Sequence, residues 1–174
     1  MTQLADDCFA FGGKLMTAAE ALALLNERIQ PLDEQETVTL RQALGRVLSE
    51  DLVSSITVPP KDNAAVDGYA FAFADLAAAG DSRLPIAGRA AAGRGLDGGY
   101  RPGSVVRIFT GAQLPEGCDT VVMQEDVRLE GNSIIIPQGL KRGANRRKAG
   151  EDLQAGRLAL KAGSRMRAQE IGLA

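Results

Sequence analysis

The sequence predicts a mainly β protein with α-helical material near its N-terminus, and three observations lead to this prediction. Capped amphipathic patterns are confined to about the first fifty residues. From about Asp51 onward, short apolar runs alternate with clusters of Gly, Pro and Asp. No stretch shows the strand–helix–strand alternation of a βαβ unit. Irregular strand spacing and 20 glycines then favour a coiled or barrel-like β lobe over a repeat fold.

Two amphipathic helices are expected before the strands begin. Thr17 and Glu20 have the spacing of a capping box, in which each side chain bonds the backbone N–H of the other residue. Apolar residues then recur at helical spacing on one face. Thr39 and Gln42 repeat the box spacing, and an apolar stripe follows over residues 40–48. Both helices are short and apolar on one side, so each needs a surface on which to pack.

Short apolar runs bounded by turn residues predict the strands. The strongest local signal is a hairpin over residues 127–136, whose two runs are joined by Gly131-Asn132, a dipeptide suited to a two-residue primed turn. The other strands are expected at residues 51–54, 66–73, 84–90, 104–109 and 120–123. Residues 164–174 begin a further helix that stops without a cap, so we interpret the chain as a piece of a longer protein.

One apparent motif is rejected. Residues 93–98 spell G-x-G-x-x-G, the dinucleotide-binding pattern. That pattern works only when a helix follows and directs its N-terminus at the pyrophosphate. Here Pro102 and Gly103 open the next strand instead, so we interpret the segment as a loop.

Composition excludes several classes of function. Of the 174 residues, 45% are hydrophobic and 24% are charged, which is ordinary for a soluble globular protein. Aromatic residues make up 4% and Trp is absent, which disfavours modules that stack nucleic-acid bases. The net charge of −2 gives no attraction to DNA or to an anionic membrane. The absence of histidine removes His-based zinc sites and Ser–His or Cys–His nucleophiles.

The sequence also favours a cytoplasmic location. The most apolar early stretch, Leu15 to Leu25, is interrupted by Glu20 and is too short to span a bilayer. Cys8 and Cys118 lie far apart and are interpreted as reduced cytosolic thiols rather than a disulfide. We expect Cys118 to be a small buried residue without an activating partner.

Three turn-rich segments have the composition of a binding site: PPKDNAAVDGYA (59–70), RIFTGAQLPEGCDTVVMQED (107–126) and GANRRKAGEDL (143–153). The first two place carboxylates and hydroxyls at strand ends, where a rigid scaffold usually presents binding groups. The third has two adjacent arginines and then an acidic pair. A solvated linker explains this charge run more simply, but paired arginines also suit the capture of phosphate or other oxyanions. Together the segments indicate an anion and metal site.

These segments resemble the N-terminal part of the molybdopterin molybdenumtransferases, the MoeA and gephyrin-E family of molybdenum cofactor assembly. The resemblance runs from Ala18 to the last residue. It rests on VPPKDNAAVDGYA (58–70), TGAQLPEGCDTVVMQE (110–125) and NRRKAGEDL (145–153).

The sequence departs from the family pattern at four positions. The family typically has an aromatic residue where Lys61 stands, Ser where Ala64 stands and Met where Val66 stands. In the third block, Arg147 takes the place of the motif arginine and Arg146 replaces an aliphatic residue.

The resemblance implies an elongated α/β domain with an inserted β-barrel-like domain. On this basis we expect an N-terminal helical segment at residues 1–35, an elongated domain at 36–56 plus 151–174, and the inserted β-rich domain at 57–150. The family's later α/β domain is absent from this chain. In the family, the active site lies between the β-rich domain of one subunit and that later domain of the other.

The resemblance also implies a function. The expected enzyme is a Mg²⁺-dependent homodimer that takes adenylylated molybdopterin and molybdate, cleaves the adenylate and leaves molybdenum on the pterin dithiolene. Other molybdenum cofactor biosynthesis proteins are its expected partners, whereas nucleic acids and membranes are not. This chain would contain only half of the site and would be inactive alone.

Four residues carry the expected chemistry. Asp67 would act in catalysis and hold Mg²⁺, although an Asp-Gly turn explains it equally well from sequence alone. Thr110 would bind substrate, or would satisfy its own turn. Arg147 would clamp phosphate or molybdate, or would form a surface salt bridge with Glu151. Asp152 would be the second catalytic residue, by orienting Arg147 or sharing the metal, or would cap the loop.

Two further acidic residues are weaker candidates. Asp119 is expected to shape the loop before residues 120–123, and Glu125 ends that strand and could reach the site.

Two other kinds of function remain open. A non-catalytic scaffold that binds a protein partner is slightly favoured by Lys61, Ala64 and Val66. A metal-independent anion-binding domain would need Arg147 but not Asp67.

Overall fold

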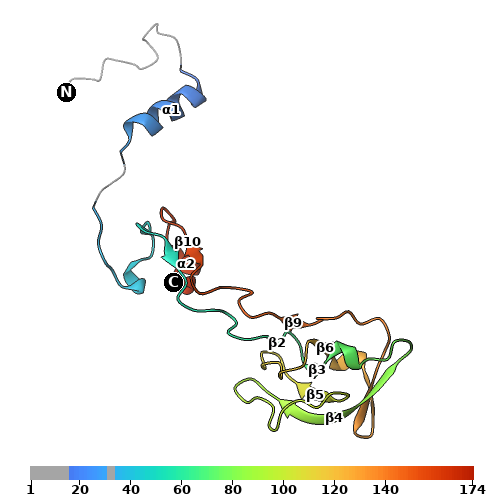
Figure 1. Ribbon diagram of the computed structural model, residues 1–174. Coiled ribbons are helices and arrows are strands. Elements are labelled where there is room, and N and C mark those ends of the chain that lie inside the picture. Colours follow the sequence, from blue (N-terminus) through green and yellow to red (C-terminus); the bar gives the residue numbers. More distant parts are fainter. Residues whose placement is uncertain (1–15, 31–33) are drawn as a thin grey trace, which may run out of the picture. The chain divides into compact units, whose positions relative to one another are not determined.

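The computed structural model describes residues 16–30 and 34–174 (Figure 1). The chain divides into two compact units, residues 1–38 and 39–174. The first unit contains helix α1 (Ala18–Arg28). Its predicted capping box is confirmed, because Glu20 N–H donates to Thr17 Oγ1 at 3.2 Å and Thr17 N–H donates to the Glu20 carboxylate at 2.7 Å. No residue of α1 is buried.

The second predicted helix is wrong beyond its first turn. The predicted capping box forms, but only the 3-10 turn η1 (Leu40–Gln42) follows it. Gly45 then adopts φ 81°, a left-handed conformation that ends the helical path. Its N–H donates to Met166 O at 2.8 Å, and Leu48 N–H donates to Ser164 O at 2.9 Å. Pairing with a distant segment therefore overrides the local helical pattern.

The second unit is mainly β, as predicted. Its strands are β1 (Leu52–Val53), β2 (Asn63–Ala64), β3 (Gly68–Phe71), β4 (Ser82–Ala90), β5 (Val105–Ile108), β6 (Thr120–Met123), β7 (Arg128–Glu130), β8 (Ser133–Ile136), β9 (Arg146–Arg147) and β10 (Leu158–Leu160). The remaining elements are the 3-10 turns η2 (Phe73–Asp75) and η3 (Gln124–Asp126) and the predicted last helix, α2 (Ala168–Leu173). Every predicted strand overlaps an observed one. The strands that were not predicted, β2, β9 and β10, are too short to show a pattern.

Six strands form one curled sheet in the order β6-β3-β5-β4-β8-β7 (Figure 1). Strand β4 pairs with β8 through its first half and with β5 through its second half, and its register shifts between Ile86 and Gly88. The β4–β5 pair is parallel, and the segment between the two strands is a loop that contains the rejected glycine motif. The predicted β7–β8 hairpin is confirmed, and Gly131 at its turn has φ 60°.

Both faces of β3, β5 and β6 are buried. Alternate residues of these strands pack into two different hydrophobic clusters. One cluster contains Ala70, Val106 and Val121, and the other contains Phe71, Val105 and Val122. Successive side chains of a strand point to opposite faces, so each strand is mostly apolar, apart from Arg107 in β5. These strands form a rigid base for the loops at their ends.

The chain enters and leaves the six-stranded sheet through neighbouring segments. Strand β1 pairs with β10 in antiparallel fashion. Closer to the sheet, Val58 N–H donates to Leu153 O at 2.9 Å and Leu153 N–H donates to Val58 O at 3.1 Å. The division into an elongated and an inserted domain stays a prediction. In the part of the chain that the structure describes, no helix is both long and apolar enough to cross a membrane.

Candidate functional site

The pairing of β3 with β5 brings Asp67 and Thr110 together. These antiparallel strands place Gly68 opposite Ile108, so the residue before β3 meets the residues after β5. Asp67 Oδ1 accepts hydrogen bonds from Thr110 N–H at 2.8 Å and from Thr110 Oγ1 at 2.7 Å. These two bonds, the backbone one foremost, lower the pKa of Asp67. The carboxylate is therefore ionised at neutral pH.

The second oxygen of Asp67 suits a hydrated magnesium ion. Both bonds from Thr110 go to Oδ1, and no described residue bonds Oδ2. Mg²⁺ binds proteins through one or two carboxylates and keeps several waters or substrate oxygens. Residues 16–30 and 34–174 contain no group of three or more Asp, Glu, Cys or His residues that could hold a metal ion. The donor set fits a metal shared with water and substrate, rather than a cage of protein ligands.

Gly68 fixes the position of Asp67 relative to the sheet. A Cβ atom added at Gly68 would lie 1.9 Å from Val122 O. Only glycine lets β3 approach β6 this closely. On the same strand pair, Gln124 N–H donates to Asp67 O at 3.1 Å. The backbone that carries Asp67 is thus held by β5 and β6 together.

Arg147 and Asp152 form a second pair, as the sequence suggested. Arg147 Nη2 donates to Asp152 Oδ1 at 2.5 Å, and Arg147 Nε donates to Glu151 Oε1 at 3.2 Å. The bond to Asp152, and then the bond to Glu151, raise the pKa of Arg147. The structure therefore contains both the orienting contact with Asp152 and the salt bridge with Glu151.

The three turn-rich segments predicted from the sequence lie side by side. Ala64, in β2, accepts from Gly111 N–H at 2.8 Å and donates to Ala112 O at 2.9 Å. On its other side β2 pairs with β9, and Ala65 N–H donates to Asn145 O at 2.9 Å. The segment around β2 thus joins the loop of Thr110 to the loop of Arg147. Among the described residues, no hydrogen bond or ion pair links Asp67 or Thr110 to Arg147 or Asp152.

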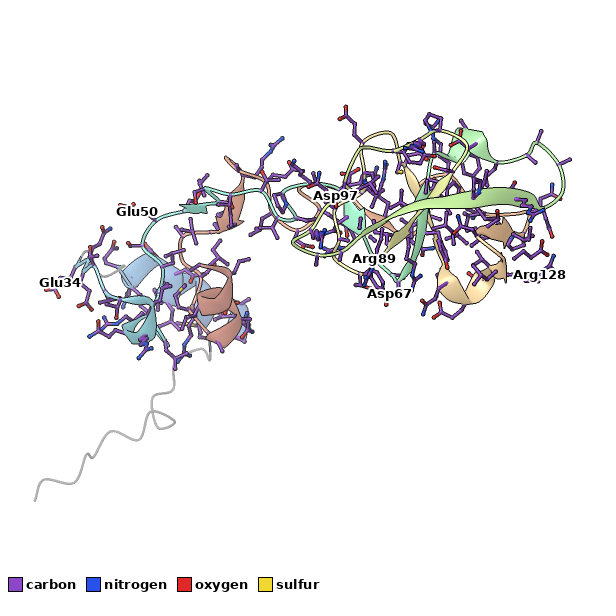
Figure 2. All side chains as sticks on the ribbon, turned by 90° about the horizontal axis from the view of Figure 1, so that it is seen from below. Glu34, Glu50, Asp67, Arg89, Asp97 and Arg128 are labelled. Carbon is purple, nitrogen blue, oxygen red and sulfur yellow. The ribbon has the colours of Figure 1, made fainter. Side chains whose placement is uncertain are left out.

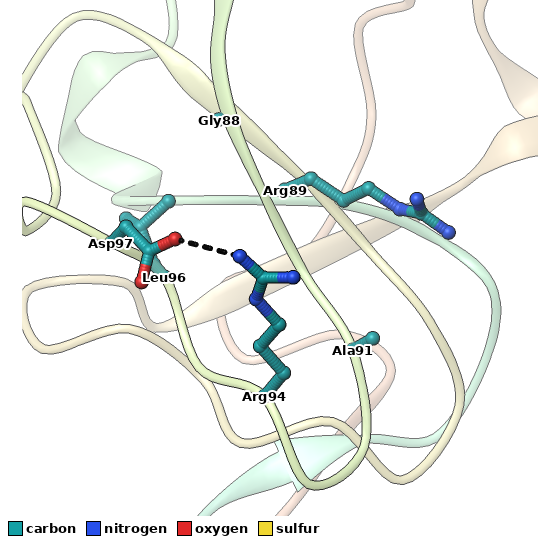
Figure 3. Close-up of a pocket in the computed structure, with 6 residues that line it drawn as sticks. All are labelled: Gly88, Arg89, Ala91, Arg94, Leu96 and Asp97. Carbon is teal, nitrogen blue, oxygen red and sulfur yellow. Dashed lines mark hydrogen bonds and ion pairs between the residues drawn. The ribbon is translucent and has the colours of Figure 1, made fainter.

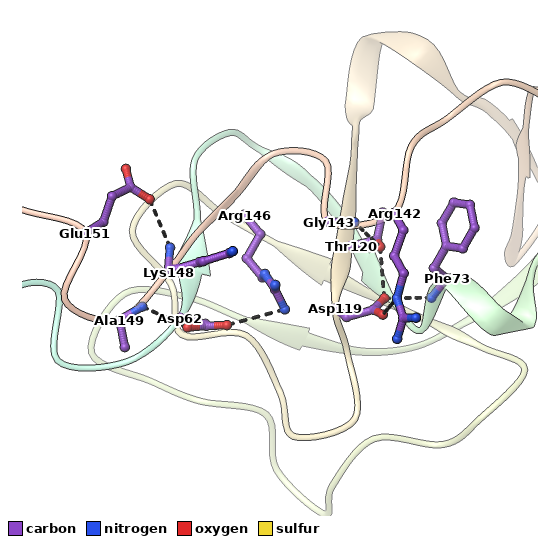
Figure 4. A network of polar contacts seen from close by, with 10 residues as sticks. All are labelled: Asp62, Phe73, Asp119, Thr120, Arg142, Gly143, Arg146, Lys148, Ala149 and Glu151. Atoms are coloured by element: carbon purple, nitrogen blue, oxygen red, sulfur yellow. Dashed lines mark hydrogen bonds and ion pairs between the residues drawn. The ribbon is translucent and has the colours of Figure 1, made fainter.

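The arginines of the basic segment, residues 141–148, are paired with carboxylates of the chain; Figure 4 shows two of these pairs. Arg142 pairs with Asp119 at 2.7 Å, and Arg146 pairs with Asp62 at 3.4 Å. Asp62 also accepts from Ala149 N–H at 2.8 Å, which fastens the third turn-rich segment to the first. Arg142 and Arg146 therefore tie this segment to other parts of the fold, which a solvated linker would not do.

Asp119 joins three elements, in agreement with the loop-shaping role expected for it. Its Oδ1 accepts from Phe73 N–H at 2.8 Å and from Thr120 Oγ1 at 2.9 Å, and its Oδ2 accepts from Arg142. Burial alone would raise the pKa of Asp119, but these bonds lower it overall. Beside it, Cys118 is partly buried rather than buried, and this burial raises the pKa of its thiol to about 12, which makes it a poor nucleophile.

Two of the departures from the family pattern concern packing. Ala64 is 1% exposed and belongs to the cluster that contains Ala70, and Val66 packs against the same cluster. Lys61 is exposed. The fourth departure, Arg146, leaves its Nε buried without a hydrogen-bond partner. The Asp67–Thr110 contact involves none of the four departing side chains.

Two arginines on β4 and β5, Arg89 and Arg107, were not predicted as site residues from the sequence, and the charge of Arg107 acts on Asp67. The Arg107 guanidinium lies 5.1 Å from the centre of the Tyr69 ring and 4.7 Å from that of Phe109. Arg89 lies 4.8 Å from the same Phe109 ring. The available signal was the two-residue spacing of Arg107, on β5, and Phe109, which follows β5 and directly precedes Thr110.

The rejected glycine motif forms the wall of an open hollow of about 450 Å³ (Figure 3). The hollow is lined by Gly88, Arg89, Ala91, Arg94, Leu96 and Asp97. Arg94 is paired with Asp97 at 3.4 Å, and both side chains are largely exposed. No helix starts here, so the segment lacks the aligned backbone N–H groups of a dinucleotide site.

Comparison with known families settles what kind of chain this is. A family model described as the MoeA N-terminal region (domain I and II) matches residues 16–174. The chain belongs to this MoeA family. A crystal structure of the molybdopterin biosynthesis MoeA protein from Pyrococcus horikoshii OT3 superposes with a TM-score of 0.79 at 36% identity, covering 92% of this chain and 43% of that chain. The predicted fold class, a mainly β MoeA N-terminal region, is confirmed.

Curated MoeA relatives carry the name molybdopterin molybdenumtransferase. The protein from Haemophilus influenzae is 36% identical over 153 residues, which cover 87% of this chain and 37% of the relative. The protein from a Nostoc species is 36% identical over 151 residues, which cover 83% of this chain and 35% of the relative. The chain thus spans little more than a third of the length of these relatives.

Proposed function

We propose that this chain is the N-terminal part of a molybdopterin molybdenumtransferase. The complete enzyme would insert molybdenum from molybdate into adenylylated molybdopterin and release AMP. The observation that carries the proposal is the Asp67–Thr110 pair, which places an ionised carboxylate with one open oxygen at a strand end in a MoeA-family chain. The names of the relatives support the same activity.

Asp67 is proposed to hold Mg²⁺ through Oδ2. Thr110 occupies Oδ1 with two hydrogen bonds, which orients the carboxylate and keeps it ionised. When bound, Mg²⁺ would neutralise phosphate charge and lower the pKa of a bound water. Gly68 and the neighbouring strands keep the carboxylate in place before substrate arrives.

Arg147 is proposed to bind an oxyanion of the substrate. Asp152 and Glu151 take its Nη2 and Nε, which leaves Nη1 to donate to phosphate or molybdate. Asp152 then acts mainly by orienting the guanidinium. Two carboxylates beside one arginine also reduce its net attraction for an anion, so its contribution is directional rather than purely electrostatic.

We also infer that the complete protein is a cytoplasmic homodimer that works with other cofactor-assembly proteins. In the second unit, Leu44 and Val47 are each 64% exposed, and Val53 is 52% exposed. Exposed large apolar side chains in neighbouring segments are typical of surfaces that other domains or subunits cover. A site shared with the later domain of a second subunit would agree with this exposure.

The decisive experiment uses the full-length protein. Mg²⁺-dependent, molybdate-stimulated release of AMP from adenylylated molybdopterin would be measured for wild type and for Asp67→Asn. We expect release to fall by about 100-fold or more in Asp67→Asn, with binding of the adenylate retained. Asp97→Asn is the matched control, because Asp97 is an exposed loop carboxylate paired only with Arg94.

Two results would overturn the proposal. Undiminished release in Asp67→Asn would remove the metal role of Asp67. A wild-type protein that releases no AMP, but still binds a protein partner, would identify the chain as a scaffold of the same fold.

A further inference from the structure

We propose that Arg89 and Arg107 form an oxyanion-binding shelf beside Asp67, which takes a tetrahedral phosphoryl or molybdate group. The name arginine shelf is used below for Arg89 and Arg107 together with the rings of Tyr69 and Phe109. The inference deepens the proposed function, and the identity of the ligand rests on that function. The existence of an anion site at these residues does not rest on that function.

The strand register places the two arginines opposite each other. Tyr69 on β3 pairs with Arg107 on β5, and Arg107 pairs with Arg89 on β4. The three side chains therefore form one row across one face of the sheet. Like charges directly opposite each other on neighbouring strands destabilise a sheet. A bound anion between them would remove this repulsion.

No carboxylate of the described residues forms an ion pair with the arginine shelf. Arg142, Arg146 and Arg147 each form an ion pair with an acidic side chain. Neither Arg89 nor Arg107 forms an ion pair with any described residue. Positive charge thus remains at this face, while it is cancelled in the basic segment that the sequence made conspicuous.

Aromatic rings hold the guanidinium groups without using their N–H donors. Arg89 lies 4.8 Å and Arg107 lies 4.7 Å from the centre of the Phe109 ring. Arg107 also donates from Nη1 to Gly68 O at 3.1 Å and from Nη2 to Gln124. Arg89 is exposed and has no hydrogen bond to a described residue. Its guanidinium group therefore lies against the Phe109 ring with its N–H donors unbonded within the described part of the chain, and this arrangement suits bidentate binding of an oxyanion.

The shelf lies next to the candidate metal ligand. Asp67 directly precedes β3, and Arg107 donates to the carbonyl of the next residue, Gly68, at 3.1 Å. The charge of Arg107 contributes to the lowered pKa of Asp67. Protein-bound Mg²⁺ commonly takes one carboxylate together with phosphate oxygens of the substrate. A phosphoryl group on the shelf would meet both the arginines and that metal (Asp67 and Arg89 are labelled in Figure 2).

The hollow beside β4 is not this site. Figure 3 shows that the guanidinium of Arg89 turns away from Arg94 and Asp97. The Arg94 side chain is already paired with Asp97 at 3.4 Å. Of the two arginines that line the hollow, only Arg89 has no ion pair with a described carboxylate.

The test is equilibrium binding to the full-length protein, measured by titration calorimetry with AMP and, separately, with molybdate. Arg89→Ala is compared with wild type and with Arg83→Ala. Arg83 is the matched control because it is an exposed arginine on the same strand, paired with Ile135 rather than with another arginine. We expect Arg89→Ala to weaken binding of one ligand by about tenfold or more, and Arg83→Ala to leave it unchanged.

The two ligands distinguish the source of the anion. Loss of AMP affinity alone would assign the shelf to a phosphoryl group, and loss of molybdate affinity alone would assign it to molybdate. Wild-type affinity for both ligands in a folded Arg89→Ala, judged by an unchanged thermal midpoint, would overturn the proposal. Equal weakening by Arg83→Ala would also overturn it. If the full-length protein released no AMP but still bound a ligand in an Arg89-dependent way, only the proposed function would be contradicted.

Discussion

Thr110 is the main cause of the lowered pKa of Asp67, with a smaller contribution from the charge of Arg107. Thr110 contributes both a backbone and a hydroxyl donor to the same carboxylate oxygen. The pKa of Asp67 is thereby lowered, so the stabilisation that these bonds provide is fully present above the pKa of an unfolded Asp, about 3.9. It is lost as pH falls through the lower, folded-state pKa. The pair is therefore intact throughout the neutral range.

Replacing Thr110 by Val should raise the pKa of Asp67. The hydroxyl donor is lost while the backbone donor stays, so the pKa moves up but remains below its usual value. Carboxyl-carbon NMR titration of Asp67 in both proteins measures the two midpoints. An unchanged midpoint in Thr110→Val would show that the hydroxyl bond does not form in solution.

Gly68→Ala should destabilise the protein by about 3 kcal/mol. The new methyl group would lie 1.9 Å from Val122 O, so β3 and β6 must separate. Urea denaturation of Gly68→Ala and Gly95→Ala compares a crowded glycine with one that has no atom within 4 Å of the added Cβ. Equal stability of the two variants would contradict the close strand approach.

At the scale of elements, long-range backbone pairing determines the secondary structure where the local sequence pattern predicted it wrongly. The β7–β8 hairpin and α1 were predictable because their signals, a Gly-Asn turn and a capping box, are local. The helix expected after Thr39 ends early because its residues pair with the segment around Met166. Strands β2 and β9 have two residues each, and only their mutual pairing defines them.

The elements around β6 are tied by Asp119, and Asp119→Asn should test this tie. The variant weakens the bonds from Phe73 N–H, Thr120 and Arg142, so we expect a loss of about 1–2 kcal/mol. Chemical denaturation with Asp97→Asn as the exposed control provides the measurement. Substrate binding should be retained in the folded variant. A loss of binding without a loss of stability would instead place Asp119 in the site.

At the scale of the whole molecule, the exposed apolar residues test the proposed homodimer. Leu44→Glu combined with Val47→Glu should convert the full-length dimer to a monomer, because two charges would be buried in an apolar interface. Light scattering after gel filtration reports the mass. Leu129→Glu is the control, since Leu129 is similarly exposed but lies on β7 in the six-stranded sheet. If the double variant is still a dimer, the subunit interface does not include Leu44 and Val47.

The candidate site was only partly predictable from the sequence of the whole chain. Asp67, Thr110, Arg147 and Asp152 were found because they lie in recognisable blocks, and the structure pairs the first two and the last two. Arg89 was missed because its partners, Arg107 and Phe109, belong to a different segment of the chain. Only the register of β4 against β5 reveals that row.

The paired entry and exit of the six-stranded sheet have a mechanical consequence. The contacts between the incoming and outgoing segments form a ladder: Val47 bridges to Arg165, β1 pairs with β10, and Val58 bridges to Leu153. A tension applied at Thr39 and Ala174 would break these pairings one after another, beginning with Val47–Arg165. The six-stranded sheet next to Asp67 would experience no load until the Val58–Leu153 pairing had broken.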